Sequence, residues 1–178
     1  MFAGLRRAAT AKKKRRPVRL KSAPKSENKN YDHFTPISGQ ASARMHAGDY
    51  VAPFVLPHFK QLKADLIGVF GNNDGERENL KKRFMELSAQ MRGNFAAVTL
   101  EGLRIAMVHG HEEELLQSLI DVESYDVIVY GHTHEAKAYK KGKTLIINPG
   151  ETCGYLTGKP TVAILNTRTL DVKIIPLE

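Results

Sequence analysis

The feature that most constrains this chain is an apolar, β-branched run that ends directly in a polar cluster, an arrangement that occurs four times. Short apolar runs of this kind are typical of buried strands. The runs cover residues 66–70, 103–108, 126–130 and 144–147, and the clusters that follow are Gly71-Asn72-Asn73-Asp74, His109-Gly110-His111, Gly131-His132-Thr133-His134 and Asn148-Pro149-Gly150. Ligands of open α/β sheets bind beyond the carboxyl ends of strands. The pattern therefore predicts an α/β domain with its chemistry gathered at strand ends.

Helical spacing of apolar residues marks two further stretches. Residues 75–91 carry apolar side chains three or four positions apart, and residues 112–123 begin with glutamates, which favour the first turn of a helix. Residues 161–165 and 172–176 are predicted as additional strands. Strand–helix–strand order followed by closely spaced strands indicates a layered α/β domain that contains some antiparallel sheet.

Length and composition exclude several classes of protein. The 178 residues fit one domain. No apolar run approaches the roughly 18–20 residues that cross a bilayer, so we expect no membrane partner. A single cysteine, Cys153, excludes a disulfide framework and a cysteine-based zinc finger. The first residues lack the apolar stretch of a secretory signal, which favours a cytoplasmic location.

The net charge of +8 is distributed unevenly. Residues 1–47 carry a net charge of +10, whereas residues 48–178 carry −2. Residues 1–45 also lack an apolar period, so we expect a basic segment that is disordered or aberrant, followed by a domain over 46–178. The basic run 12–16 could contact nucleic acid or act as a localisation signal, but such a run is more often a solvated tail, and no aromatic residue interleaves it. We expect at most non-specific nucleic-acid contact from this tail.

The polar clusters hold residue types that bind metal ions. His132 and His134 form an H-x-H pair, and i and i+2 side chains of extended backbone point to the same side. His109, Asn72 and Asp49 add imidazole, amide and carboxylate groups. Such a set without thiolate suits Mn, Fe, Ni, Co or Zn rather than a structural zinc site. An aspartate can bridge two ions, and paired ions suit displacement at a phosphoester.

The order of these motifs is similar to that of a known protein family. The motifs GD (48–49), GNND (71–74), HGH (109–111) and GHTH (131–134) occur in order and precede NPGETCGYLTGKPTVAIL. Over about residues 46–178 the chain closely resembles the small single-domain phosphodiesterases of the calcineurin-like metallophosphoesterase superfamily. The resemblance implies a four-layer α/β/β/α sandwich and a phosphodiesterase that hydrolyses small phosphodiesters with a metal-activated water. It also implies two divalent metal ions, with Mn as the first choice and Ni, Fe, Co or Zn as alternatives.

The resemblance also implies a metal-ligand set. Asp49 would bridge the two metals. Asn72, His109 and His132 would complete one metal site, and His134 would contribute to the other.

The same resemblance implies roles beside the metals. Asp74 would orient a neighbouring group. Many family members have a histidine at position 73 as proton donor to the leaving group, but this chain has Asn73, which cannot act as an acid, so His111 becomes the candidate. Asn148 and Gly150 would support the site. Arg77 could meet a phosphate, although an exposed helical arginine is more often solvated.

One family element is missing from the sequence. The family begins with a strand that ends in D-x-H, followed by a helix and a second strand. Here the nearby Asp32 and His33 are adjacent and follow no apolar run. We therefore expect the first strand and its D-x-H motif to be absent or replaced, and the sheet to lose two strands. One hypothesis is that residues before about His46 are an out-of-frame translation, because a shifted frame over 35–37 can encode Asp-Thr-His; the alternative is a divergent N-terminus.

Three functions stay open at this stage. The first is a two-metal phosphodiesterase, impaired if the D-x-H ligands are lost. The second is a non-catalytic scaffold or interaction protein on the same fold, like the small subunit of retromer. The third is a nucleic-acid-binding protein driven by the basic tail, whose binding would depend steeply on salt. Self-association into a homo-oligomer is also open, because an unpaired sheet edge favours it.

Overall fold

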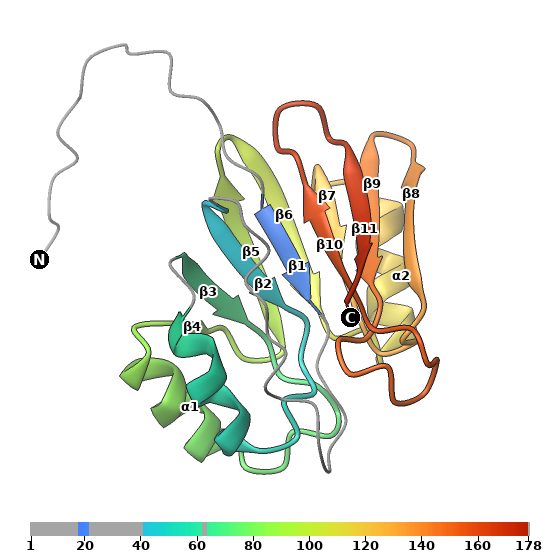
Figure 1. Ribbon diagram of the computed structural model, residues 1–178. Helices are drawn as coiled ribbons and strands as arrows, with labels where there is room; N and C mark the ends of the chain where they lie inside the picture. The colour runs from blue at the N-terminus through green and yellow to red at the C-terminus, as the bar shows by residue number, and fades with distance from the viewer. Residues whose placement is uncertain (1–17, 22–40, 62–63, 178) are drawn as a thin grey trace, which may run out of the picture.

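The computed structural model describes residues 18–21, 41–61 and 64–177. Two β-sheets face each other, and the helices α1 (Arg77–Glu86) and α2 (Glu113–Val122) lie on the outer sides of the pair (Figure 1). Buried apolar side chains fill the space between the sheets, the space under α1 and the space under α2. The layers therefore follow the order α/β/β/α, as the family resemblance implied.

Within the described residues, the first sheet has six strands in the order β11-β10-β1-β2-β3-β4. The four from β1 to β4 are parallel neighbours, and β10 is antiparallel to both β1 and β11. Their bounds are β1 Val18–Lys21, β2 Ala43–His46, β3 Asp65–Gly68, β4 Gln90–Met91, β10 Thr161–Leu165 and β11 Val172–Pro176.

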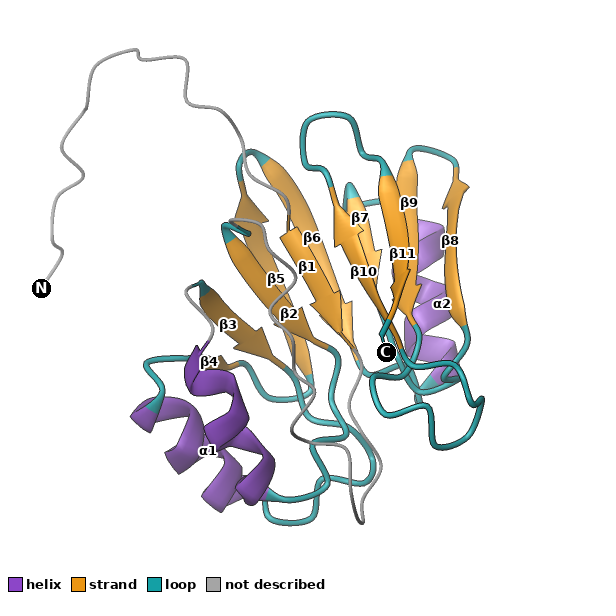
Figure 2. Ribbon diagram, viewed as in Figure 1, coloured by secondary structure: helices purple, strands orange, loops and turns teal. Residues whose placement is uncertain are grey.

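The second sheet has five strands among the described residues, in the order β5-β6-β7-β9-β8. The central three run parallel, and the edge strands β5 and β8 are each antiparallel to a neighbour (Figure 2). Their bounds are β5 Phe95–Leu100, β6 Leu103–Val108, β7 Val127–Val129, β8 Ala136–Lys141 and β9 Thr144–Pro149. Because helices and sheet cover both faces of β7 and β9, these strands are apolar almost throughout.

The short 3₁₀ helix η2 (Pro53–Gln61) follows the end of β2. It packs with α1 on the outer face of the first sheet, where Phe59 of η2 and Leu80 and Phe84 of α1 are buried. The two elements hold the loops that leave β2 and β3. Among the described residues, no helix is long and apolar enough to cross a membrane.

Most predicted elements are confirmed to within about two residues. The predicted strands 66–70, 103–108, 126–130, 144–147, 161–165 and 172–176 correspond to β3, β6, β7, β9, β10 and β11, and the predicted helix 112–123 corresponds to α2. The helix predicted over 75–91 is wrong at its end, because α1 stops at Glu86 and Met91 lies in β4. Leu87 and Met91 keep helical spacing, yet they pack under the sheet from a turn and a strand.

Sequence patterns missed β5, β8 and η2. The strand β8 is mostly exposed and rich in lysine, which suits a sheet edge but carries no alternating apolar signal. In η2 the internal Pro57 hides the helical character.

The expected loss of two strands is wrong. The backbone of Val18–Lys21 forms β1 between β10 and β2, and β2 begins at Ala43, so the described residues of the first sheet have no gap there. A strand of only four residues is too short to show a clear apolar alternation, so the local sequence does not indicate it. The expected disorder of residues 1–45 is therefore wrong for 18–21 and 43–45. The basic run 12–16, Asp32, His33 and residues 35–37 lie outside the described residues.

Candidate metal centre and active site

A tight turn after β2 brings the first acidic side chain between the two sheets. Gly48 has φ of 91°, and Asp49, although not a glycine, has φ of 59°. A Cβ on Gly48 would lie 2.6 Å from the backbone nitrogen of Gly71, so only glycine allows this approach. The turn therefore packs directly against the Gly71–Asp74 loop that follows β3.

The Asp49 carboxylate is buried and surrounded by donors. Its Oδ1 accepts a hydrogen bond from the backbone nitrogen of Asn73 at 2.9 Å, and its Oδ2 accepts one from Nδ2 of Asn73 at 2.8 Å. Nε2 of His109 lies 3.3 Å from Oδ2. Burial alone would raise the pKa of Asp49, but His109 and Asn73 together hold it well below its usual range. The group is therefore a carboxylate at neutral pH.

His109 joins the two sheets. At the end of β6, its Nδ1 donates a hydrogen bond to the carbonyl oxygen of Ala47 at 2.7 Å, so the hydrogen of a neutral ring resides on Nδ1. The other nitrogen, Nε2, lies 2.9 Å from Oδ1 of Asn72 and 3.3 Å from Oδ2 of Asp49. When Nδ1 carries the ring's single hydrogen, Nε2 is an acceptor that faces two further oxygen acceptors, and either a proton on Nε2 or a bound cation relieves this arrangement. A cation bound among them satisfies all three, so this donor set fits a divalent metal ion.

The loop after β7 brings two further histidines to the same region. His132 and His134 both have φ of 63°, a left-handed conformation that non-glycine residues adopt rarely and mostly at functional sites. The ring of His132 lies 5.2 Å from that of His109, centroid to centroid. Burial, followed by the charges of His109, lowers the pKa of His132. A lowered pKa keeps the imidazole neutral and available as a ligand.

His134 is supported by a residue that the sequence analysis did not identify. Its Nδ1 donates to Oε2 of Glu151 at 2.9 Å, and Glu151 is fully buried. Burial opposes ionisation, but hydrogen bonds from Thr157 and His134 lower the pKa of Glu151 below its ordinary value. An acidic residue directly after the Asn148-Pro149-Gly150 turn was the available signal.

Asp74 faces away from the converging acceptors. Its Oδ2 accepts from the backbone nitrogens of Asp49 at 3.0 Å and Gly71 at 2.8 Å, and its Oδ1 accepts from that of Val51 at 2.8 Å. Burial, together with the charge of Asp49, raises its pKa, while these backbone donors oppose the rise. The side chain ties the two loops together through these backbone contacts.

The candidate acid His111 lies beside the histidine cluster. Its ring is 5.5 Å from that of His109 and 6.2 Å from that of His132, centroid to centroid. Nε2 lies 3.7 Å from Oε1 of Glu112, and Nδ1 is buried without a hydrogen-bond partner among the described residues.

Asn148 joins the loop after β7 to the turn after β9. Asn148 is buried, and its Nδ2 donates to the carbonyl of Gly131 at 2.8 Å and to Oγ1 of Thr133 at 2.9 Å, while its Oδ1 accepts from Gly150. Arg77 is neither free nor fully solvated. It donates to the carbonyl oxygens of Asp74 at 3.2 Å and Gly71 at 3.4 Å and to Oδ1 of Asn94, and it stacks on Phe70.

The structure thus brings together Asp49, Asn72, Asn73, His109, His111 and His132, and His134 lies on the same loop as His132, where its ring contacts Glu151. In the part of the chain that the structure describes, no three His, Cys, Asp or Glu residues are already arranged around a common ion position. Asn72 supplies an amide oxygen, which such a set omits, and Asp49 and His109 are engaged with neighbouring side chains. Binding an ion here requires these side chains to exchange hydrogen bonds for metal bonds.

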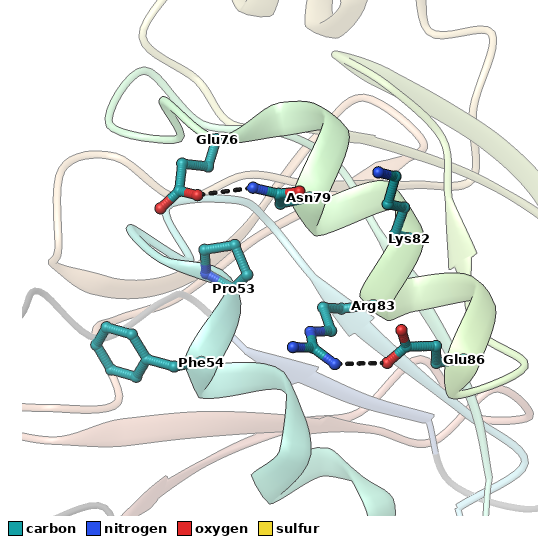
Figure 3. Close-up of a pocket in the computed structure, with 7 residues that line it drawn as sticks. All are labelled: Pro53, Phe54, Glu76, Asn79, Lys82, Arg83 and Glu86. Atoms are coloured by element: carbon teal, nitrogen blue, oxygen red, sulfur yellow. Dashed lines mark hydrogen bonds and ion pairs between the residues drawn. The ribbon is translucent and has the colours of Figure 1, made fainter.

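A separate surface pocket lies between η2 and α1 (Figure 3). Its volume is ≈ 440 Å³, and its lining includes Phe54 and Lys82. Two interactions on its wall join side chains of α1 or the turn before it: Asn79 to Glu76 at 2.9 Å and Arg83 to Glu86 at 2.8 Å. None of the predicted site residues lines this pocket, so the chemistry of the strand ends is not located there.

Comparisons with known proteins identify relatives. The sequence profile of the calcineurin-like phosphoesterase superfamily domain matches residues 31–170. A phosphodiesterase of Methanocaldococcus jannaschii is 42% identical over 135 residues, which cover 75% of this chain and 81% of that protein. A solved archaeal phosphodiesterase superposes with a TM-score of 0.79 at 34% identity, over 90% of this chain and 99% of that one. Vps29 of Chaetomium thermophilum shares the fold at a TM-score of 0.61 and 16% identity, over 90% and 95%.

Proposed function

The chain belongs to the calcineurin-like phosphoesterase superfamily, and from this premise we propose that it is a metal-dependent phosphodiesterase that hydrolyses small phosphodiesters. Its relatives in Methanocaldococcus jannaschii and Escherichia coli are named phosphodiesterases. The jannaschii relative is matched over four fifths of its own length, so the comparison covers most of that enzyme.

One observation carries the proposal. Oδ2 of Asp49 and Oδ1 of Asn72 both face Nε2 of His109, whose other nitrogen already donates to the carbonyl of Ala47. In the neutral ring with its hydrogen on Nδ1, a cation at Nε2 would have one nitrogen and two oxygen ligands, a donor set that suits a divalent metal ion. Support for a metal centre therefore comes from this chain's own contacts as well as from its family.

In this proposal the ligands divide between two metal ions. Asn72, His109 and His132 would hold one metal ion, Asp49 would bridge, and His134 would hold a second. Mn is the first candidate, and Ni, Fe, Co and Zn also suit oxygen and nitrogen donors. When bound, two such ions lower the pKa of a water molecule and neutralise charge on the phosphoryl oxygens.

The remaining residues would orient groups and handle protons. Asn73 donates two hydrogen bonds to Asp49 and holds the plane of its carboxylate. Asp74 fixes the backbone of the same loop through its three amide contacts. His111 would carry the proton that the leaving oxygen takes up when its bond to phosphorus breaks. Asp74 and Asn73 are thus positioning residues, and His111 is the candidate that would touch the substrate.

The competing function is a non-catalytic scaffold on the same fold. It is favoured by the absence of a D-x-H motif from the sequence, because without it the second metal keeps only Asp49 and His134 among the described residues. Against it stand the retained ligand-type side chains and the contacts that orient them. We further propose a small phosphodiester as the partner; homo-oligomerisation stays a prediction.

Metal content and turnover test the proposed function together. The purified protein is loaded with Mn, Ni, Fe or Zn, the bound metal per chain is measured by inductively coupled plasma mass spectrometry, and hydrolysis of an aryl phosphodiester is followed. We expect two metals per chain with turnover. If the protein binds one metal or none and shows no turnover, the proposed enzymatic function is overturned and the non-catalytic scaffold becomes the favoured function.

A matched pair of variants sharpens this test. D49N removes the proposed bridging charge, whereas D65N makes the same change at an exposed position at the start of β3. D49N should lose both metal and turnover, and D65N should keep both.

A further inference from the structure

Glu151 makes different contacts with its two carboxylate oxygens. Oε1 accepts three hydrogen bonds, from the backbone nitrogens of Leu156 at 2.9 Å and Thr157 at 2.6 Å and from Oγ1 of Thr157 at 2.8 Å. Oε2 faces Nδ1 of His134 at 2.9 Å, with the weak thiol donor of Cys153 3.8 Å away. The whole side chain is buried, so water does not compete for either oxygen.

These contacts select one form of the His134 ring. A carboxylate oxygen only accepts hydrogen bonds, so Nδ1 of His134 must carry a hydrogen to face Oε2. The neutral ring then has its lone pair on Nε2, the form in which a histidine binds a metal through that atom. The backbone of His134 has φ of 63°, a left-handed conformation that non-glycine residues rarely adopt.

The three donors on Oε1 make the site sensitive to an isosteric change. In E151Q, the carbonyl oxygen of the new amide can accept these three hydrogen bonds only if it occupies the position of Oε1. Its NH₂ group then faces Nδ1 of His134. Because an NH₂ group donates, Nδ1 would have to become the acceptor, and the ring hydrogen would move to Nε2. The substitution that changes shape least should therefore invert the tautomer of His134.

We propose that Glu151 is a positioning residue that sets the tautomer of His134 and leaves Nε2 free to bind a cation. The role of Nε2 as a metal ligand rests on the proposed function. The tautomer does not, because it is a property of the metal-free protein and can be measured there. Failure of one is therefore distinguishable from failure of the other.

Nitrogen-15 NMR of the His134 ring tests the proposal in metal-free protein at about pH 8.5, above the usual titration range of imidazole. In the parent protein, Nδ1 should show the shift of a protonated ring nitrogen and Nε2 that of an unprotonated one. In E151Q the two assignments should exchange. Protonation on Nε2 in the parent, or an unchanged tautomer in folded E151Q, would overturn the proposal.

Two further variants separate tautomer control from stability. T157V removes one donor to Oε1 and leaves the Oε2 contact intact, so it should weaken the loop and keep the parent tautomer. E151A removes the acceptor without adding a donor. Loaded with Mn, E151Q should bind metal at the second site about 10–100-fold more weakly than the parent, and more weakly than E151A. If E151A instead binds no better than E151Q, the added donor has no effect and the proposal fails. If E151Q does not fold, the proposal is judged by the tautomer of His134 in the parent protein and in T157V, which should both carry the ring hydrogen on Nδ1.

Discussion

The Oδ2 atom of Asp74 accepts a hydrogen bond from the backbone nitrogen of Asp49 at 3.0 Å, although 25 residues separate the two along the chain. The bond links the loop after β3 to the loop after β2, which are the ends of neighbouring parallel strands. Asp74 thus holds the backbone of Asp49 in place, while Asn73 and His109 contact the Asp49 carboxylate.

Replacing Asp74 should cost both stability and site geometry. In D74N, an amide NH₂ would face backbone donors that now meet a carboxylate oxygen, so we expect a loss of about 1–3 kcal/mol in the free energy of unfolding. Metal binding should weaken with it. Urea denaturation and metal titration measure the two effects. E76Q, an equal change of charge at an exposed position, is the control. Equal stability of D74N and E76Q would contradict the role of Asp74 in holding the two loops together.

Metal removal should destabilise the folded protein. Because three acceptors converge at Nε2 of His109, a bound cation should raise the melting temperature in a concentration-dependent way. A hundredfold excess over Kd corresponds to about 2.7 kcal/mol. Differential scanning calorimetry with and without a chelator measures the shift, which D49N should abolish. A melting temperature that is the same in EDTA and in saturating Mn would exclude the metal centre.

His111 should matter most for poor leaving groups. An alkoxide needs a proton as it departs and a nitrophenolate hardly does, so H111Q should lower kcat on an alkyl phosphodiester by about 10²-fold or more and have a much smaller effect on a nitrophenyl diester. Metal content should not change. Equal losses on both substrates would indicate that His111 does not supply the proton.

Acid should remove part of the stability that Glu151 contributes. Its pKa is lowered from an ordinary value of 4.5, so the unfolded chain binds the proton at higher pH than the native protein does. The contribution is fully present above pH 4.5 and is lost as the pH falls through the native pKa. The difference in unfolding free energy between the parent and E151Q should therefore shrink from pH 7 toward acid. E135Q, at an exposed neighbour of His134, controls for loss of a charge.

The packing of α1 should support the Gly71–Asp74 loop. Leu80 lies on the inner face of α1 and is fully buried, whereas Met85 on the same helix is 68% exposed. L80A should cost about 2–5 kcal/mol through lost burial and a cavity, and M85A less than about 0.5 kcal/mol. Chemical denaturation compares them. A similar cost for both would mean that α1 does not hold the loop by its buried face.

Local patterns predicted the elements that position the site. The apolar runs of β3, β6, β7 and β9 are long enough to identify as strands, and each ends in a polar cluster. The local patterns failed where the sequence signal was short or ambiguous. The strand β1 is only four residues long, and the turn at Leu87 keeps helical spacing of apolar residues while it leaves the helix.

The candidate site shows the same division. The sequence alone determined which donor groups exist and that they follow strand ends, because those properties depend on residue type and on short-range periodicity. Only the tertiary structure decided which atoms face one another: Asp74 toward backbone amides, Nε2 of His109 toward two oxygens, and Glu151 toward His134. These contacts join residues far apart in the chain, and they form because parallel strands align their carboxyl ends at one rim of the sandwich. No local pattern specifies that alignment.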